Sequence, residues 1–335
     1  MEKKKIKVFI DFEAITNNFL KRIPRKIDVP FLPYCYTVGM YKNNDSKNAF
    51  LIKSSLMSFK NFKAKNYVIK LKQNILNDLS ILAKEEITLK NIDEKIEFYG
   101  WNPQMENLIL NHLFNVPCYN ASQYRRNKPI SLSLKTVVPH DGEQHYFAET
   151  KRIIKSKKAG IDIDIFNDPG FAAAFLGYLR FLHFNKIALP KKGLKLSDQD
   201  FQKIDTDIIN YNKDDVLKLD YCYKNQSIIM QRSKKLDGLN QDINKHSSLL
   251  KNQKQSLANF KKIVDKKAKF NPSIQVEDLK QMAENKIAQY NLLLKFIKEL
   301  PDNIVTLEEA IMWANLKIES TEDKILQAKK EKQEM

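Results

Sequence analysis

Short apolar runs and amphipathic stretches alternate along the first two-thirds of the chain. A short apolar run predicts a strand, and apolar residues that recur three and four positions apart predict a helix. We expect strands at 6–12, 31–41, 49–52 and 96–99, and helices from Pro103, over 171–183 and over 198–224. The first three strands follow one another closely, as in a meander. This order of elements predicts an α/β domain.

The pattern changes after about residue 224, where strand-like runs nearly vanish and apolar residues recur at heptad spacing. The heptad positions are Leu236, Ile243, Leu250, Leu257 and Val264, with Leu239 and Phe260 at the second seam position. His246 and Gln253 occupy that same seam and weaken it. We therefore expect an α/β domain over 1–223 and a helical coiled-coil or hairpin module over 224–335.

Two breaks give the C-terminal region the turns that a helical hairpin needs. Asn271–Pro272 ends its first helix, and a second helix over 276–300 ends at Pro301. A third helix begins at the capping box of Thr306 and Glu309. The later helices can fold back over the apolar stripe. The polar seam residues favour this arrangement over a homodimer or a partner protein, which stay as alternatives.

Composition adds a strong positive charge to this picture. The hydrophobic content of 43% is ample for a core, and 57 Lys and Arg against 40 Asp and Glu give a formal charge of +17. Such an excess attracts polyanions, of which nucleic acid is the commonest. The stretch 224–269 holds 12 basic against 3 acidic residues. A generally Lys- and Asn-rich composition is the alternative explanation of the charge.

The cysteines and the N-terminus bear on location. Cys35, Cys118 and Cys222 lie far apart without a C-x-x-C pair, so neither a zinc knuckle nor a disulfide framework is indicated. The first apolar run is interrupted at once by Asp11, which makes it too short for a signal peptide. No later run approaches the length of a membrane span. We expect a cytoplasmic protein that does not cross a membrane.

The strongest chemical signal is the run from Val8 to Glu13, an apolar strand that carries Asp11 and Glu13. Residues two apart on a strand face the same side, so these carboxylates should converge. Two like charges at the end of an apolar strand need a counter-charge, which Mg²⁺ or Mn²⁺ would supply through oxygen ligands. A strand edge with solvated acids is the alternative.

A second signal is the short strand and tight turn that precede Glu106, which lies in the first turn of the next helix. The helix dipole favours a carboxylate there, and a strand-to-helix loop can open onto a site. An ordinary acid at a helix start is the alternative interpretation.

The third signal is the pair Tyr211 and Asp215, which are four residues apart and share one helix face. A surface helix with an acidic pair is the alternative. Asp207 and Asp214 are the nearest substitutes for Asp215 if the register is different.

The three motifs in this order resemble the DEDD exonuclease superfamily, the DnaQ-like branch of ribonuclease H-like proteins. That family carries D-x-E on its first strand, an Asn-x-x-x-Asp-type motif at a following helix, and Y-x-x-x-D or H-x-x-x-x-D on a late helix. The matching residues are Asp11 and Glu13, Asn102 and Glu106, and Tyr211 and Asp215. The match spans most of residues 6–222. Segments 30–34 and 131–135 look similar to an uncharacterised bacterial subgroup.

The resemblance implies a ribonuclease H-like mixed sheet flanked by helices. It also implies a 3′-5′ exonuclease that cuts single-stranded DNA or RNA with two Mg²⁺ or Mn²⁺ ions. Asp11 would bridge both ions. Glu13 and Asp215 would complete the shell of one ion, and Glu106 would serve the other. Tyr211 would orient the attacking water.

One departure from the family concerns Glu106, because most members have Asp there. The extra methylene shifts the oxygens by more than about 1 Å, and catalytic geometry is sensitive at that scale. No histidine is followed by Asp five residues later, which leaves the tyrosine version of the third motif. A nuclease-like module that binds nucleic acid without cutting, or serves assembly, is therefore an alternative. A coiled-coil interaction protein is another.

Side chains beside the motifs could hold a nucleic-acid strand. Phe12 and Trp101 could stack on terminal bases, although core packing is the alternative for both. The basic stretch 224–269 could extend the nucleic-acid track, or could be the solvated face of a coiled coil.

Overall fold

The computed structural model describes residues 5–24, 27, 29–47, 49–122, 132–138, 146–157, 161–189 and 195–335. The chain forms two compact units, Met1–Ser233 and Lys234–Met335. The division falls inside one long helix, α9 (Gln226–Ala268). Ser131, which begins one of the segments similar to the bacterial subgroup, lies outside the described residues.

The first unit is built on a five-stranded sheet of order β3-β2-β1-β4-β5. Its strands are β1 (Ile6–Thr16), β2 (Phe31–Tyr41), β3 (Phe50–Leu56), β4 (Ile96–Gly100) and β5 (Cys118–Asn120). The first three form an antiparallel meander, whereas β4 runs parallel to β1 and β5 runs parallel to β4. The expected meander is confirmed, and β1 continues beyond the predicted end because Ala14 and Ile15 are buried.

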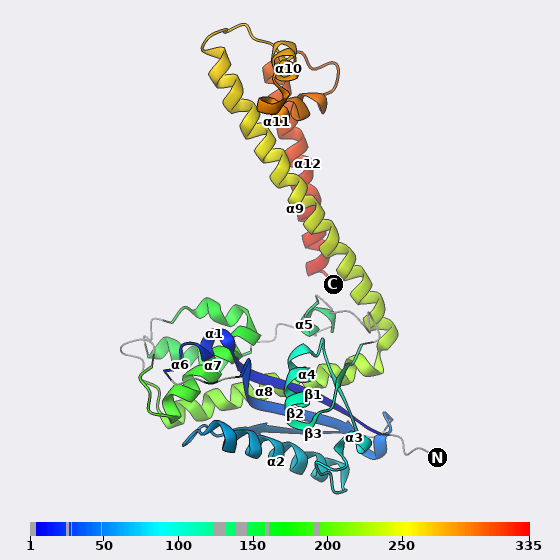
Figure 1. Cartoon of the computed structure of the whole chain (residues 1–335). Helices are drawn as coiled ribbons and strands as arrows, with labels where there is room; N and C mark the ends of the chain where they lie inside the picture. The colour runs from blue at the N-terminus through cyan, green and yellow to red at the C-terminus, as the bar shows by residue number, and fades with distance from the viewer. Residues whose placement is uncertain are drawn as a thin grey trace. The chain divides into compact units, whose positions relative to one another are not determined.

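Helices cover both faces of this sheet (Figure 1). They are α1 (Asn17–Leu20), α2 (Ala64–Ala83), α3 (Ile92–Lys95), α4 (Gln104–Phe114), α5 (Leu134–Val137), α6 (Ala148–Ser156), α7 (Pro169–Phe184) and α8 (Asp198–Lys224), with 3₁₀ turns at η1 (Lys42–Asn44) and η2 (Ile163–Asn167). Tyr36 of β2 donates a hydrogen bond to Asp78 of α2 on one face, at 2.7 Å. On the other face Asn212 of α8 reaches Asp11. The expected α/β class, with helices flanking a mixed sheet, is confirmed.

A β-bulge interrupts the pairing of β1 with β2 beside the predicted site. Glu13 pairs with Cys35 but Ala14 pairs with Pro33, so Tyr34 is an extra residue on β2. The Tyr34 hydroxyl donates to the carbonyl of Ala173 in α7 at 2.7 Å. Bulges bend a strand and re-aim its side chains, and they are common next to active sites. This one fixes the end of β1 against α7 just where Glu13 emerges.

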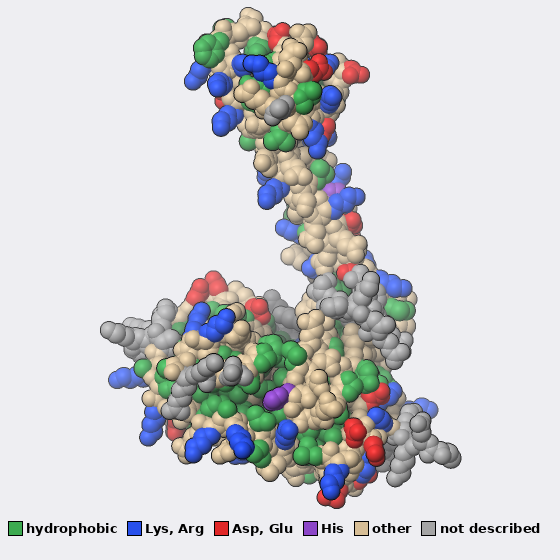
Figure 2. All heavy atoms as spheres, in the orientation of Figure 1, with side chains coloured by type: hydrophobic (Ala, Val, Ile, Leu, Met, Phe, Trp, Pro, Cys, Tyr) green, Lys and Arg blue, Asp and Glu red, His purple; other side chains and the backbone are tan. Residues whose placement is uncertain are grey.

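An apolar pocket of ≈ 320 Å³ lies among α2, α4 and the start of β2. Its lining includes Tyr67, Leu71, Leu108 and His112. Figure 2 shows hydrophobic side chains gathered around a histidine on the visible face of this unit, with Lys and Arg side chains near its margin. The acidic residues of β1, Asp11 and Glu13, are not among the residues that line this pocket.

The second unit contains the remainder of α9 with α10 (Val276–Asn285), α11 (Ile287–Lys298) and α12 (Leu307–Gln333). The apolar stripe of α9, including Leu257 and Phe260, packs against side chains of α10, α11 and α12. Ion pairs of α9 with α12 join Lys254 to Glu322 at 2.6 Å and Lys235 to Glu331 at 2.9 Å. The later helices of the same chain therefore cover the stripe.

One feature of this unit differs from the sequence-based expectation, and another agrees with it. The second helix is divided at Lys286, whose φ of −138° and ψ of 52° interrupt it. The third helix has the predicted capping box, because the Glu309 amide donates to Thr306 Oγ1 at 3.2 Å and the Thr306 amide donates to Glu309 at 2.9 Å.

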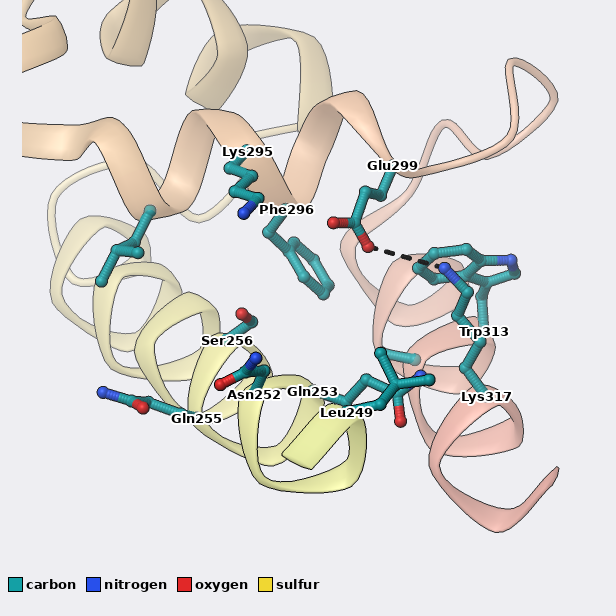
Figure 3. Close-up of a pocket in the computed structure, with 12 residues that line it drawn as sticks. Leu249, Asn252, Gln253, Gln255, Ser256, Lys295, Phe296, Glu299, Trp313 and Lys317 are labelled. Carbon is teal, nitrogen blue, oxygen red and sulfur yellow. Dashed lines mark ion pairs between the residues drawn. The ribbon is translucent and has the colours of Figure 1, made fainter. Parts of the chain in front are cut away.

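The seam of the helical unit contains polar atoms and a cavity. His246 Nδ1 and Gln253 Oε1 are buried without a hydrogen-bond partner among the described residues. Gln253 also lines a cavity of ≈ 330 Å³ formed by α9, α11 and α12 (Figure 3). Lys317 pairs there with Glu299 at 3.5 Å and lies 4.2 Å from the centre of the Trp313 ring. Across the described ranges, the chain contains no helix of the length and apolarity that a membrane crossing requires.

Candidate metal centre

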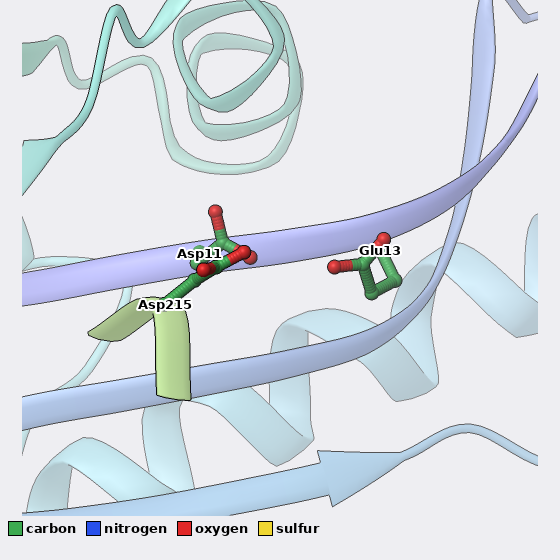
Figure 4. A group of neighbouring side chains, drawn as sticks. All are labelled: Asp11, Glu13 and Asp215. Carbon is green, nitrogen blue, oxygen red and sulfur yellow. The ribbon is translucent and has the colours of Figure 1, made fainter. Parts of the chain in front are cut away.

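Three carboxylates meet where β1 faces α8. Asp11, Glu13 and Asp215 each offer an oxygen, and these oxygens all lie within 4.8 Å of one another. Figure 4 shows the first two projecting from β1 and the third reaching them from α8. The strand period explains the first pair, because residues two apart share one face of a strand. We call Asp11, Glu13 and Asp215 the acidic cluster.

Burial and mutual repulsion make this cluster electrostatically unfavourable without a cation. Glu13 is only 7% exposed, and the side chain of Asp215 is 16% exposed. Burial, and then the charges of Glu13, Asp215 and Glu106, raise the pKa of Asp11 well above its ordinary value. Burial and the charge of Asp215 raise the pKa of Glu13 in the same way. Such a site gains from a bound cation, which would relieve the repulsion.

Asn212 holds the acidic cluster in place from α8. Its side chain is fully buried, and its Nδ2 donates a hydrogen bond of 2.5 Å to Asp11 Oδ2. A hydrogen bond from the same side chain lowers the pKa of Glu13, although burial outweighs it. The sequence motifs assign no role to this residue. The available signal was its position three residues before Asp215, on the same helix face.

Glu106 lies near the acidic cluster but outside it. It is 5% exposed, in the first turn of α4, and burial raises its pKa from an ordinary 4.5 to about 7. Its charge raises the pKa of both Asp11 and Glu13, so it contributes to the same electric field. Its carboxylate is nevertheless not among the three whose oxygens lie within 4.8 Å of one another. The structure thus brings three of the four predicted ligands into one group.

Tyr211 is placed beside Asp215, as the helical spacing predicts. Its hydroxyl hydrogen-bonds to the Asp215 carboxylate, and its ring packs against Tyr146 and Phe147 at 5.0 and 5.4 Å between centroids. Burial, and then the charges of Glu13, Asp215 and Asp11, raise the pKa of Tyr211 above its ordinary value. The hydroxyl therefore stays protonated and can act as a hydrogen-bond donor.

Lys218, to which the sequence motifs also assign no role, brings a positive charge to the cluster. It lies on α8 three residues after Asp215, and its Nζ is 2.9 Å from Asp215 Oδ1. Burial lowers the pKa of Lys218, but Asp215, Asp214 and Tyr146 outweigh burial and raise it overall. The lysine is therefore charged. Spacing alone could have suggested the contact with Asp215, but not the one with Tyr146.

The two alternative aspartates have other partners. Asp207 accepts hydrogen bonds from the backbone amide and the Oγ1 of Thr150, at 2.8 and 2.7 Å, and so anchors the start of α6. Asp214 pairs with Lys218 at 2.6 Å and accepts a hydrogen bond from Tyr146. Neither belongs to the acidic cluster.

The suggested aromatic platforms are engaged in packing. Phe12 is 1% exposed and lies on the sheet face opposite Asp11, so the idea that it stacks on a base is wrong. Trp101 is partly buried, and its Nε1 donates to the Leu132 carbonyl at 2.8 Å. Asn102 has a φ of 46°, a left-handed conformation that Asn tolerates better than most residues. Its place in the turn therefore has a backbone explanation.

The donor set of this centre fits a hard divalent cation. All its candidate ligands are carboxylate oxygens, the type that Mg²⁺ and Mn²⁺ prefer. The three cysteines are free and buried, with raised pKa values that keep them protonated, which does not favour a thiolate metal site. Comparison with known proteins gave no match to a family model, a curated protein or a solved structure.

Proposed function

We propose that this protein is a divalent-metal-dependent nuclease with a ribonuclease H-like domain. The observation that carries the proposal is the convergence of Asp11, Glu13 and Asp215 from β1 and α8, with their oxygens within 4.8 Å. Three buried carboxylates at this spacing repel one another, and bound divalent cations would relieve that repulsion. Two-metal sites of this kind serve phosphodiester hydrolysis. The resemblance of the motifs to DEDD exonucleases supports the same reaction class.

Each residue has a distinct role in this proposal. Two divalent ions, when bound, would polarise the scissile phosphate and lower the pKa of the attacking water. Asp11 would be the ligand common to both ions, held in its rotamer by Asn212. Glu13 and Asp215 would complete one coordination shell. Glu106, which lies outside the acidic cluster, would act on the other ion through water.

Tyr211 would position the attacking water by hydrogen bonding. Its hydroxyl is protonated and already contacts Asp215, so it can hold a water next to that ligand. A general-base role would require a tyrosinate, which the raised pKa opposes. The tyrosine therefore contributes orientation rather than proton abstraction.

The substrate we propose is single-stranded DNA or RNA, cut from its 3′ end. The formal charge of +17 supports a polyanionic partner, and the 12 basic residues of 224–269 would add affinity. The direction of cutting rests on the motif resemblance alone. A cytoplasmic location remains a prediction from cysteine use and the N-terminal sequence.

The proposal is tested by incubating the full-length protein with 5′-labelled single-stranded DNA and RNA, in Mn²⁺ and in EDTA. We expect a ladder of products shortened from the 3′ end, only with metal. Asp215→Asn should abolish it. Asp207→Asn, on the same helix but bonded to Thr150, is the matched control and should retain cleavage. Tight binding without cleavage would instead support a nucleic-acid-binding module that has lost catalysis.

A further inference from the structure

Lys218 is a buried ammonium group whose donors are all engaged beside the acidic cluster. Its side chain is 4% exposed. Its Nζ lies 2.6 Å from Asp214 Oδ2, 2.9 Å from Asp215 Oδ1 and 2.6 Å from the Tyr146 hydroxyl oxygen. An ammonium group has three N–H donors. None is therefore left to turn toward a substrate phosphate.

The charge of Lys218 acts on carboxylates beyond its direct ion-pair partners. It opposes the rise of the pKa at Asp11 on β1 as well as at Asp215 on α8. An ion held by these carboxylates would stand in the same field, but it would be repelled by the ammonium group instead of attracted. It would also share the Asp215 carboxylate with a hydrogen bond that already occupies Oδ1.

We infer that Lys218 is an internal counter-cation, which stabilises the acidic cluster without metal and weakens the binding of any ion held by Asp215. This inference rests on the proposed metal centre, but not on cleavage. A phosphate-binding lysine would need a free donor, and Lys218 has none among its described contacts. A purely structural lysine would leave metal affinity unchanged. A lysine that positions Asp215 for the metal would strengthen metal binding.

The direct test is titration of Mn²⁺ into metal-free full-length protein, with binding measured by isothermal titration calorimetry. Lys218→Met keeps the length of the side chain and removes its charge. We expect its Mn²⁺ Kd to fall at least about tenfold, which corresponds to about 1.4 kcal/mol. Lys224→Met is the matched control, because Lys224 pairs with Asp220 at 2.9 Å on the same helix, has its Nζ 5.3 Å from the centre of the Tyr41 ring, and is 42% exposed. Its Kd should equal that of the wild type.

A double-mutant cycle guards against the charge that Lys218→Met leaves unpaired on Asp214. The Kd of Asp214→Asn is compared with that of Asp214→Asn combined with Lys218→Met, which also protects the test if the single lysine variant fails to fold. The double variant should still bind Mn²⁺ at least several-fold more tightly than Asp214→Asn alone. Equal or weaker binding on loss of the lysine would overturn the inference.

The outcome is separable from that of the proposed function. If Mn²⁺ binding tightens in the Lys218 variants but no protein cuts nucleic acid, the counter-cation stands and the nuclease proposal fails. If no variant binds Mn²⁺, the metal centre and the counter-cation both fail. If the wild type cuts nucleic acid but the Mn²⁺ Kd is unchanged in the Lys218 variants, the nuclease proposal stands and the counter-cation inference fails.

Discussion

Replacing Asp11 by Asn should make the metal-free protein more stable while it abolishes metal binding. The amide keeps an oxygen that can accept the hydrogen bond from Asn212, now 2.5 Å long, and removes one charge from the acidic cluster. Two full charges at the 4.8 Å limit of this group repel by about 3 kcal/mol at an effective dielectric constant of about 20. Because the raised pKa of Asp11 and Glu13 lets protons relieve part of that repulsion, we expect a net gain of about 1–2 kcal/mol at pH 7.

The assay is thermal unfolding of the full-length protein in EDTA and in Mn²⁺. A gain of this size corresponds to a rise in Tm of roughly 2–8 °C for Asp11→Asn in EDTA. Mn²⁺ should raise the Tm of the wild type and leave that of the variant almost unchanged. Asp11→Ala, which removes one of the two carboxylates that accept from Asn212, should gain less in EDTA. A clear loss of stability in Asp11→Asn would show that the carboxylate is structural, and would refute the reasoning.

Three further predictions follow from the same geometry. Tyr211→Phe should lower the cleavage rate about 10- to 1000-fold with little change in Mn²⁺ affinity, and unchanged turnover would give the role to another group. Burial raises the pKa of Glu106 from 4.5 to about 7. The folded protein therefore keeps the full contribution of this group to its stability below pH 4.5, and that contribution to the free energy of unfolding falls as the pH rises from 4.5 through 7. The free energy of unfolding of Glu106→Gln, measured with denaturant, should therefore exceed that of the metal-free wild type by a difference that grows by up to about 3 kcal/mol between pH 5 and pH 8. A difference that does not change with pH would contradict this. A fragment ending at Ser233 should stay folded by circular dichroism and cut with lower affinity, whereas an insoluble fragment would place the helices in the nuclease core.

Strand and helix positions in the α/β unit follow closely from hydrophobic pattern. The period of two places Asp11 and Glu13 on one face, and the capping box of Ser197 and Asp200 marks the start of α8. Helix α2 went unassigned, although its buried residues repeat at intervals of four from Tyr67 to Leu79. Local pattern is therefore sufficient wherever one face of an element is buried and the other is not.

The missing parts of the site depend on contacts between distant segments. Tyr146 precedes α6 and reaches Lys218 of α8, which no local periodicity can indicate. The unpredicted bulge lies between β1 and β2, and its extra residue Tyr34 is anchored to Ala173 of α7. The break at Lys286 also lacks a local proline or glycine to announce it. Tertiary packing decides these features, so the sequence alone could not supply them.

The central claim is most directly tested by single-turnover cleavage of a labelled single strand by wild-type protein and by Asp11→Asn, prepared side by side in Mn²⁺. The two proteins then differ only in the Asp11 carboxylate, which we propose as a ligand of both ions. We predict shortened products with the wild type, none above background with the variant, and none for either protein in EDTA. Equal cleavage by the two proteins, or cleavage by the wild type that persists in EDTA, would contradict the assignment of the acidic cluster as a metal-dependent nuclease site.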